Sequence, residues 1–194
     1  MQIFPTYEDL FVFVRNSNEI EGIFAGPNDR LHFGQHLSAA ARLGDSEQLV
    51  DSRWIHARVM KHLLDYPHEP GQYRSCSIVV GPRQMPSAEV LMQLMTTFDE
   101  NVFTTLEHYK QGKLRGENLE AKLNELFDNA LCIHPFTDGN GRTFRLFLNH
   151  LRQRCGLPWI LFGGHEWTVH LGRLRDYEIT QFKPKHEWAY DPGV

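Results

Sequence analysis

The chain has 194 residues, of which 41% are hydrophobic and 23% are charged, and its formal net charge is -4. This composition is that of an ordinary globular protein and argues against a disordered, fibrous or membrane-embedded chain. The length suits one well-buried domain. Because a small negative charge provides no broad attraction for a phosphate backbone, we do not expect nucleic acid as a partner.

Three widely spaced cysteines, Cys76, Cys132 and Cys155, include no CxxC pair. This disfavours both a disulfide framework and a structural zinc site, and it fits a reducing, cytoplasmic location. The first residues contain no basic segment followed by a small-residue cleavage site. No run reaches the roughly 18 to 20 apolar residues that cross a bilayer, so we expect neither export nor a membrane partner.

Apolar periodicity in the first half of the chain predicts two helices. One covers 7–22, with a candidate break near Asn16, and the other covers 48–66. No element is predicted for 23–47. Segment 73–81, YRSCSIVVG, is rich in β-forming residues and predicts a short strand or hairpin.

Three stronger helical patterns follow. Ser87 can cap a helix that extends to about Lys110. A second pattern starts at Asn118 and ends before Pro135, and a third covers 142–154. The sequence therefore predicts one mainly α domain with a small β element.

Residues 134–145 read HPFTDGNGRTFR and join the last two of these helices. Gly139 and Gly141 permit backbone angles that turn amides inward, and an anion bound there would also meet the N-terminus of the next helix. Arg142 and Arg145 are three residues apart, so both can reach phosphate oxygens. This pattern predicts a polyphosphate site.

Two side chains beside the predicted phosphate site add chemistry. Asp138 is the carboxylate positioned to hold Mg²⁺ as an oxygen ligand. His134 has an ordinary pKa near neutrality, so it can take a proton from an attacking hydroxyl. Alone, a histidine before a proline is more often structural, and two arginines on a helix more often face solvent. Their combination in one short run indicates nucleotide-dependent transfer to a hydroxyl.

The run fits the HPFx[D/E]GNGRxxR signature and thereby resembles the Fic family, adenylyltransferases that move AMP from ATP onto protein hydroxyl groups. The resemblance implies a Fic-type helical bundle with a small β-hairpin flap, as a single domain over 1–194 in which 160–194 is a C-terminal extension. His134 would be the catalytic base, Asp138 the Mg²⁺ ligand, and Phe136 an anchor in the core. The implied phosphate-binding residues are Gly139, Asn140, Gly141, Arg142 and Arg145.

The resemblance also implies a flap over residues 71–82. An extended segment of the target protein would add a strand to its exposed edge. The flap residues implied in this docking are Ser75, Cys76, Ser77, Ile78, Val79 and Val80.

The second glycine of the loop bears on which group is transferred. Relatives of the Doc type transfer phosphate and have a lysine at this position. Because this chain has Gly141, the resemblance favours transfer of AMP.

A second motif lies at the end of the first predicted helix. Residues 17–22, SNEIEG, fit the [S/T]xxxE[G/N] inhibitory motif of many Fic proteins, and on a helix Ser17 and Glu21 share a face. By resemblance, Glu21 would pair with Arg145 and exclude the γ-phosphate of ATP. We therefore expect an autoinhibited enzyme with low basal activity.

Two alternatives remain. Glu21 could activate water for removal of AMP, or the chain could be a non-catalytic module that senses a nucleotide. The acceptor residue (Tyr, Thr or Ser), the target protein, which could be the chain itself, and any oligomer are left open. No histidine pair has zinc-ligand spacing, so we expect His32, His36, His56 and His62 at the surface or at interfaces.

Overall fold

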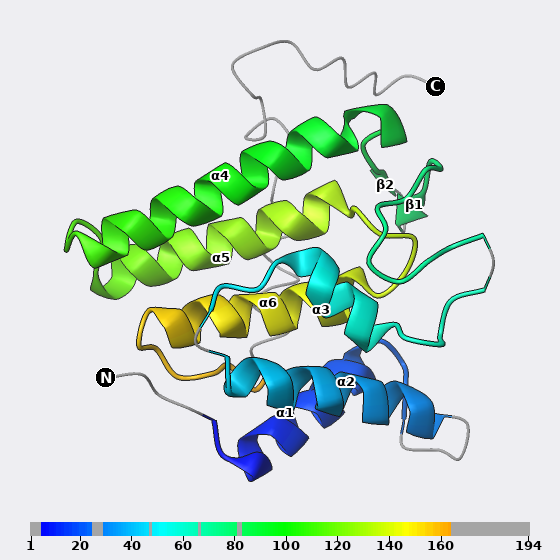
Figure 1. Cartoon of the computed structure of the whole chain (residues 1–194), viewed down its shortest axis with the longest axis horizontal. Helices are drawn as coiled ribbons and strands as arrows, with labels where there is room; N and C mark the ends of the chain where they lie inside the picture. The colour runs from blue at the N-terminus through cyan, green and yellow to red at the C-terminus, as the bar shows by residue number, and fades with distance from the viewer. Residues whose placement is uncertain (1–4, 25–28, 47, 66, 81–82, 164–194) are drawn as a thin grey trace.

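The computed structural model describes residues 5–24, 29–46, 48–65, 67–80 and 83–163 (Figure 1). Most of the C-terminal extension expected over 160–194 lies outside these ranges. The described residues form six α-helices, a small antiparallel sheet and a 3₁₀ turn. These elements are α1 (Tyr7–Ile20), α2 (Arg30–Gly44), α3 (Ser52–Val59), β1 (Val79–Val80), β2 (Arg83–Gln84), η2 (Ala88–Val90), α4 (Leu91–Lys110), α5 (Gly116–Ile133) and α6 (Asn140–Arg154).

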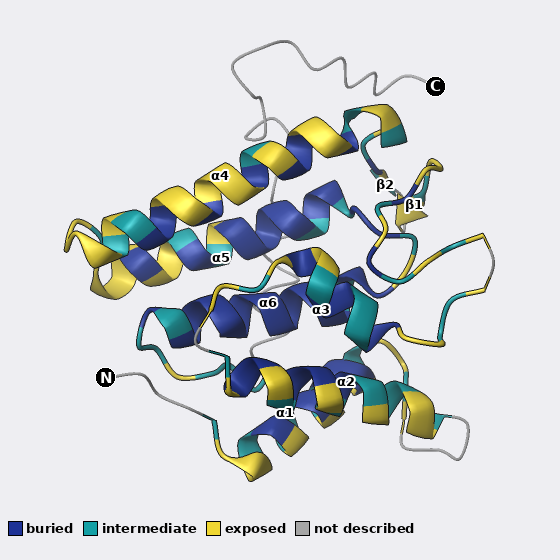
Figure 2. Cartoon of the chain, in the orientation of Figure 1, coloured by how far each residue is buried: buried dark blue, intermediate teal, exposed yellow. Residues whose placement is uncertain are grey.

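Helix α6 is the centre of the fold. Helices α5, α3, α2 and α1 pack against it, and α4 packs on the outer side of α5 (Figure 1). Figure 2 shows α6 buried along almost its whole length. Apolar and polar side chains of α6 are buried alike, so the helix is joined to its neighbours by hydrogen bonds as well as by apolar packing. The buried polar residues are Asn140, Arg142, Thr143, Arg145, Asn149, His150, Arg152 and Gln153.

Helix α1 begins at a capping box. The Thr6 hydroxyl accepts a hydrogen bond from Asp9 N at 3.1 Å, and the Asp9 carboxylate accepts from Thr6 N at 2.8 Å. The predicted break near Asn16 is wrong, because the helix continues through it and Asn16 Nδ2 donates to the carbonyl of Leu161 at 2.9 Å. The helix ends at Ile20, and Glu21 is its C-cap.

Helix α2 has no counterpart among the predicted helices. Its buried face uses the small residues Ala39 and Ala40, and it contains Gly34, so its apolar periodicity is weak. The helix is joined to α1 by His36, whose Nδ1–H donates to Asn18 Oδ1 at 3.0 Å. The expectation of a surface position for His36 is wrong, since its side chain is fully buried.

Helix α3 is shorter than the predicted helix over 48–66. It starts after Asp51, whose carboxylate accepts from Trp54 N at 2.7 Å. It ends at Val59, and the buried Met60 then packs against the loop that precedes α6. Helix α3 therefore ends at the point where Met60 packs against this loop.

The predicted strand over 73–81 is mostly irregular. Only Val79–Val80 is a strand, and Val79 pairs with Gln84 of β2 in an antiparallel hairpin. Arg74 N donates instead to the carbonyl of Pro135 at 2.9 Å, so the first half of the segment is joined to the loop after α5. The expected small hairpin is confirmed, with a shorter strand than predicted.

The three later helices agree with their predictions apart from their starts. Helix α4 is preceded by η2, α5 begins at Gly116 rather than Asn118, and α6 begins at Asn140 rather than Arg142. The mainly α bundle is confirmed. No described helix is both long and apolar enough to cross a bilayer.

Three buried histidines of this core must be neutral. His56 Nδ1 accepts a hydrogen bond from Gly71 N at 2.7 Å, and His150 Nε2 accepts from Val50 N at 3.1 Å. Burial lowers the pKa of His56 and of His150 to about 4, and it lowers the pKa of His36 well below its ordinary value. These three histidines therefore bind a proton less readily in the folded protein than in the unfolded chain.

The free energy of unfolding should consequently decrease with acidity. The stability is present above the unfolded histidine pKa of 6.5 and is lost as pH falls from that value towards 4. Between about pH 7.5 and about pH 5 we expect a loss of about 2 kcal/mol each from His56 and His150. Urea unfolding of His150→Gln should show a flatter pH dependence, and the exposed control His108→Gln should match wild type. An unfolding free energy that stays constant over this range would contradict the assignment.

Candidate functional site

The loop between α5 and α6 begins with a histidine in an unusual backbone conformation. His134 is the C-cap of α5, with φ 50° and ψ 61° in the left-handed region. This conformation costs free energy in a non-glycine residue and persists only where neighbouring contacts stabilise it. Arg74 Nε donates to the His134 carbonyl at 2.9 Å. Phe136, two residues on, is fully buried and anchors the loop in the core, as expected.

Asn140 closes the loop with two hydrogen bonds. Its Oδ1 accepts from Phe136 N at 3.0 Å, and its Nδ2 donates to Phe136 O at 2.8 Å. The side chain is therefore occupied by the loop itself. An anion at the helix end would meet the backbone N–H of Asn140.

His56 of α3 packs against the same loop. Its ring stacks on Phe136 at a centroid distance of 3.8 Å with an interplanar angle of 6°. Its Nδ1 accepts from Gly71 N, so its Nε2–H donates to the Asp138 carbonyl at 3.0 Å. The expectation of a surface position is wrong for His56 as well, because only 1% of the residue is exposed. No local pattern indicates this role, since its partner Asp138 is 82 positions away.

The N-terminus of α6 has the geometry of an anion site. Gly139, its N-cap, adopts φ 73°, and no side chain caps the helix. The first backbone N–H groups therefore lack intrahelical partners and point out of the helix end, where the helix dipole also favours negative charge. A β-carbon at Gly139 would overlap the sulfur of Met60, so a side chain is excluded here by space as well as by backbone angle.

Both arginines of the motif are buried, which excludes the interpretation of a solvated helix face. Arg142 Nη1 donates to His32 Nδ1 of α2 at 2.8 Å. Its Nη2 lies 3.5 Å from the Asp138 carboxylate. Because its Nδ1 accepts this bond, His32 is neutral, and burial together with the charge of Arg142 lowers its pKa.

Arg145 brings the two sequence motifs together. Its Nε donates to the Ser17 hydroxyl at 2.8 Å, and its Nη2 donates to the Ser17 carbonyl at 2.8 Å and to Glu21 Oε1 at 2.5 Å. Arg145 has no exposed surface, whereas 35% of the Glu21 side chain is exposed. Burial lowers the pKa of Arg145 and the Glu21 carboxylate opposes that effect, so the acid offsets the cost of the buried cation.

Gly141 accommodates the Glu21 carboxylate. A β-carbon at this position would overlap Glu21 Oε1 and approach Arg145 Nη1. The glycine therefore leaves room for the Glu21 carboxylate in this position. Glu21, an anion from the end of α1, lies against the first turn of α6.

His134 has one ring nitrogen free of the hydrogen bond that orients it. Its Nδ1 lies 3.2 Å from the Leu131 carbonyl, and because a carbonyl can only accept, Nδ1 carries the proton. Nε2 therefore keeps its lone pair. Burial lowers the pKa of His134, the Leu131 bond opposes this, and the charge of Arg74 lowers it further, while Glu21 and Asp138 raise it. The ring is neutral at pH near 7 and able to accept a proton.

Asp138 is the accessible carboxylate of the site, with 64% of its side chain exposed. One oxygen accepts from Gly139 N at 2.5 Å. The described part of the chain contains no cluster of three His, Cys, Asp or Glu side chains that could hold a metal ion. Asp138 fits a hard cation only if phosphate oxygens and waters supply most of the ligands.

The predicted flap residues lie on the hairpin beside this loop. Val79 is 62% exposed and Val80 is 42% exposed. In the described residues the sheet contains only β1 and β2, so β1 has a second edge. Ser75, Cys76 and Ser77 are also exposed, whereas Ile78 is half-buried.

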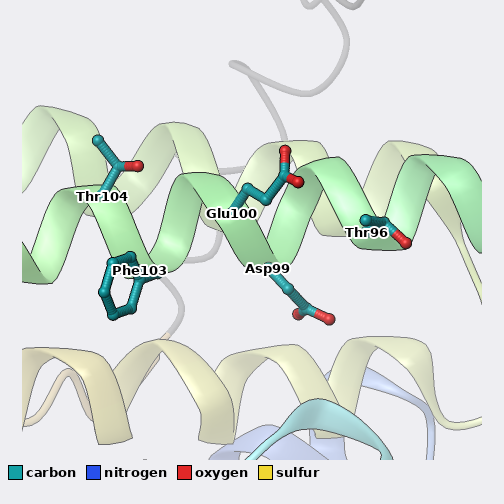
Figure 3. Close-up of a pocket in the computed structure, with 5 residues that line it drawn as sticks. All are labelled: Thr96, Asp99, Glu100, Phe103 and Thr104. Carbon is teal, nitrogen blue, oxygen red and sulfur yellow. The ribbon is translucent and has the colours of Figure 1, made fainter.

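A separate groove on α4 is not part of this site. Figure 3 shows the five side chains that line it, on the outer helix of the bundle. It has a volume of about 590 Å³, and none of its lining residues belongs to the loop or to the hairpin. They are Thr96, Asp99, Glu100, Phe103 and Thr104.

Fold and loop together define a helical domain in which a glycine-rich turn at a helix N-terminus lies beside a neutral histidine. The Fic/DOC family model matches residues 46–151. The chain is 30% identical over 160 residues to protein adenylyltransferase Fic of Nematostella vectensis, covering 75% of this chain and 33% of that protein. It is 28% identical to protein adenylyltransferase fic-1 of Caenorhabditis elegans, covering 91% of this chain and 33% of that protein.

Solved structures agree with this match. A Fic domain containing signaling protein from Bacteroides thetaiotaomicron aligns with a TM-score of 0.67 at 22% identity, over 87% of this chain and 72% of that one. Fic-1 from C. elegans aligns with a TM-score of 0.62 at 20% identity, over 91% and 57%. The chain belongs to the Fic/DOC family. It spans about a third of the length of the two curated relatives named above.

The loop geometry depends on Asn140, which leads to a prediction about stability. Asn140→Ala would leave the buried N–H and C=O of Phe136 without their partners, which should cost about 2 to 4 kcal/mol of unfolding free energy. Urea unfolding measures this cost. Asn101→Ala, at an exposed position of α4, serves as the control and should change the free energy little. Equal stability of both variants would show that Asn140 does not close the loop.

Proposed function

We propose that this chain is a protein adenylyltransferase domain that moves AMP from ATP to a side-chain hydroxyl of a target protein, and that Glu21 restrains it. The observation that carries the proposal is the ion pair between the fully buried Arg145 and the partly exposed Glu21 carboxylate at the first turn of α6. The names of the curated relatives support AMP transfer as the reaction.

The triphosphate of ATP would lie on the N-terminus of α6. Gly139 would form the turn that exposes the helix end, and the backbone N–H groups of Asn140 and Gly141 would bind phosphate oxygens. Arg142 and Arg145 would donate to the outer phosphates. Asp138 would hold Mg²⁺, which neutralises charge on bound phosphates. The exposure of the Asp138 carboxylate supports this position.

His134 would act as the general base. Its free Nε2 would remove the proton of the target hydroxyl while that oxygen forms a bond to the α-phosphorus. The bond from the α-phosphorus to the bridging oxygen of the β-phosphate breaks, and pyrophosphate leaves. The bond from Nδ1–H to the Leu131 carbonyl supports this assignment, since it orients the ring with Nε2 unprotonated.

The hairpin would present the target. Main-chain groups at the outer edge of β1 would pair with an extended segment of the target protein. The exposure of Val79 and Val80 supports this role, because their side chains are not part of the core. Ser75, Cys76, Ser77 and Ile78 precede them on the same segment.

Glu21 would inhibit by occupying the place of a phosphate. Its carboxylate lies against Gly141 and is bonded to Arg145, where a γ-phosphate would otherwise bind. ATP would then bind with its α-phosphorus out of line with the attacking oxygen, and small misplacements of reacting atoms lower rates strongly.

We expect Glu21→Gly to raise the transfer of AMP. The substitution frees Arg145 for the γ-phosphate, and removal of a competing contact worth more than 1 kcal/mol gives an increase on the order of tenfold. The matched control is Glu19→Gly on the same helix, since Glu19 is bonded to Arg15 rather than to Arg145. Incubation with ATP and Mg²⁺, followed by mass spectrometry for an AMP adduct, measures the effect.

The outcome separates the alternatives. If Glu21→Gly forms no AMP adduct with ATP and Mg²⁺, the proposed transfer of AMP is contradicted. Release of AMP from a modified target by wild type, lost in Glu21→Gly, would assign Glu21 to AMP removal. ATP binding by calorimetry without any transfer would favour a nucleotide-sensing module.

We expect His134→Ala in the Glu21→Gly background to abolish transfer while ATP still binds, because the imidazole does not contribute to the phosphate site. Burial places the His134 pKa below 6.5 in the folded protein. The base must be neutral, so the rate should rise with pH through that pKa and be flat above it. The pH dependence of kcat/KM at about pH 5 to 8 tests this, because kcat/KM reports the free protein, with His108→Ala as the exposed control. A midpoint of kcat/KM above 6.5 would refute the proposed base.

A further inference from the structure

We infer that Arg74 is a positioning residue that couples the hairpin to the backbone of His134. Neither sequence motif contains Arg74, and it lies in the irregular segment that precedes β1. The reaction it would serve is the proposed AMP transfer, whereas the coupling itself is a property of the fold.

The contacts of Arg74 join three parts of the chain. Its Nε donates to His134 O at 2.9 Å, its Nη1 donates to Cys76 O at 2.7 Å, and its Nη2 donates to Pro86 O at 2.5 Å. Cys76 precedes β1 and Pro86 follows β2, so one guanidinium contacts both ends of the hairpin. Its backbone N–H also donates to the Pro135 carbonyl at 2.9 Å. Arg74 therefore connects both ends of the hairpin to the backbone of His134.

The environment favours a cation at this point. The guanidinium lies at the C-terminal end of α5, where the helix dipole is negative, and Nη2 also lies 3.5 Å from the Ile133 carbonyl. Arg74 is only 4% exposed. Burial lowers its pKa, but a guanidinium remains charged near neutral pH. A buried charge bonded to backbone carbonyls resists displacement, because moving it would break several bonds at once.

The bond to His134 stabilises a strained conformation. A left-handed backbone is strained in a non-glycine residue, and the Arg74 bond acts on the carbonyl of that same residue. Without the bond, His134 can relax towards extended angles and move its imidazole. Lysine keeps the charge, but its ammonium lacks the planar fork that reaches carbonyls on both sides.

A target segment bound along β1 would consequently act on His134 through Arg74. Strand addition orders the hairpin, and the hairpin contacts the guanidinium at Cys76 and Pro86. The histidine would then be best placed when a target is bound. Loss of Arg74 should lower the turnover of the protein target without changing the affinity for ATP.

The test uses Arg74→Lys and Arg74→Gln in the Glu21→Gly background. We expect kcat for the protein target to fall by about 10- to 100-fold in both, as for a small misplacement of a catalytic group, with KM for ATP unchanged. The matched control is Arg53→Lys, because Arg53 donates to the Gly71 carbonyl but not to His134. Full activity of Arg74→Lys would overturn the inference.

Two further measurements do not depend on transfer. Hydrogen exchange of the amides of residues 76–80 and 83–85 should accelerate in both Arg74 variants, while Arg53→Lys matches wild type. The His134 ring resonances, assigned by their loss in His134→Ala, should shift in both variants. The pKa of His134 should rise only in Arg74→Gln, since the charge of Arg74 lowers it. If exchange and resonances change while no variant transfers AMP, the coupling stands and the proposed function fails. Unchanged exchange and resonances would refute the coupling.

Discussion

The packing of helix α1 against helix α6 depends on the fully buried cation Arg145. Arg145 has no exposed surface and lies in the first turns of the central helix, so its guanidinium needs acceptors within the protein. Helix α1 supplies them through the Ser17 hydroxyl, the Ser17 carbonyl and Glu21. The contacts that pack α1 on α6 therefore also balance the charge of Arg145 beside the candidate phosphate site.

The loop that bears His134 is stabilised by residues outside the motif. His56 stacks beneath Phe136 and bonds to the Asp138 carbonyl, and Arg74 bonds to the His134 carbonyl. The motif side chains keep an unprotonated Nε2 on His134 and an exposed carboxylate on Asp138. The side chains proposed to react are close together in the sequence, whereas the residues that position them, His56 and Arg74, are distant from them.

Much of the bundle could be predicted because α4, α5 and α6 have strong apolar periodicity over many turns. Helix α2 could not, since its buried face uses Ala39 and Ala40 and offers little apolar contrast. The buried positions of His36 and His56 were equally inaccessible to pattern reasoning. A histidine can be buried whenever hydrogen-bond partners satisfy its ring, and those partners lie 18 and 82 positions away.

The sequence by itself determined the contiguous elements of the candidate site. HPFTDGNGRTFR places a histidine, a carboxylate, glycines and two arginines within one loop and one helical turn, and local spacing is enough to bring such residues together. Only the tertiary structure decided that both arginines are buried and that Arg74 joins the hairpin to His134. The contact between Glu21 and Arg145 was expected from the family resemblance and not from local spacing. Those contacts depend on how helices pack across long sequence separations, and a local pattern contains no information on that packing.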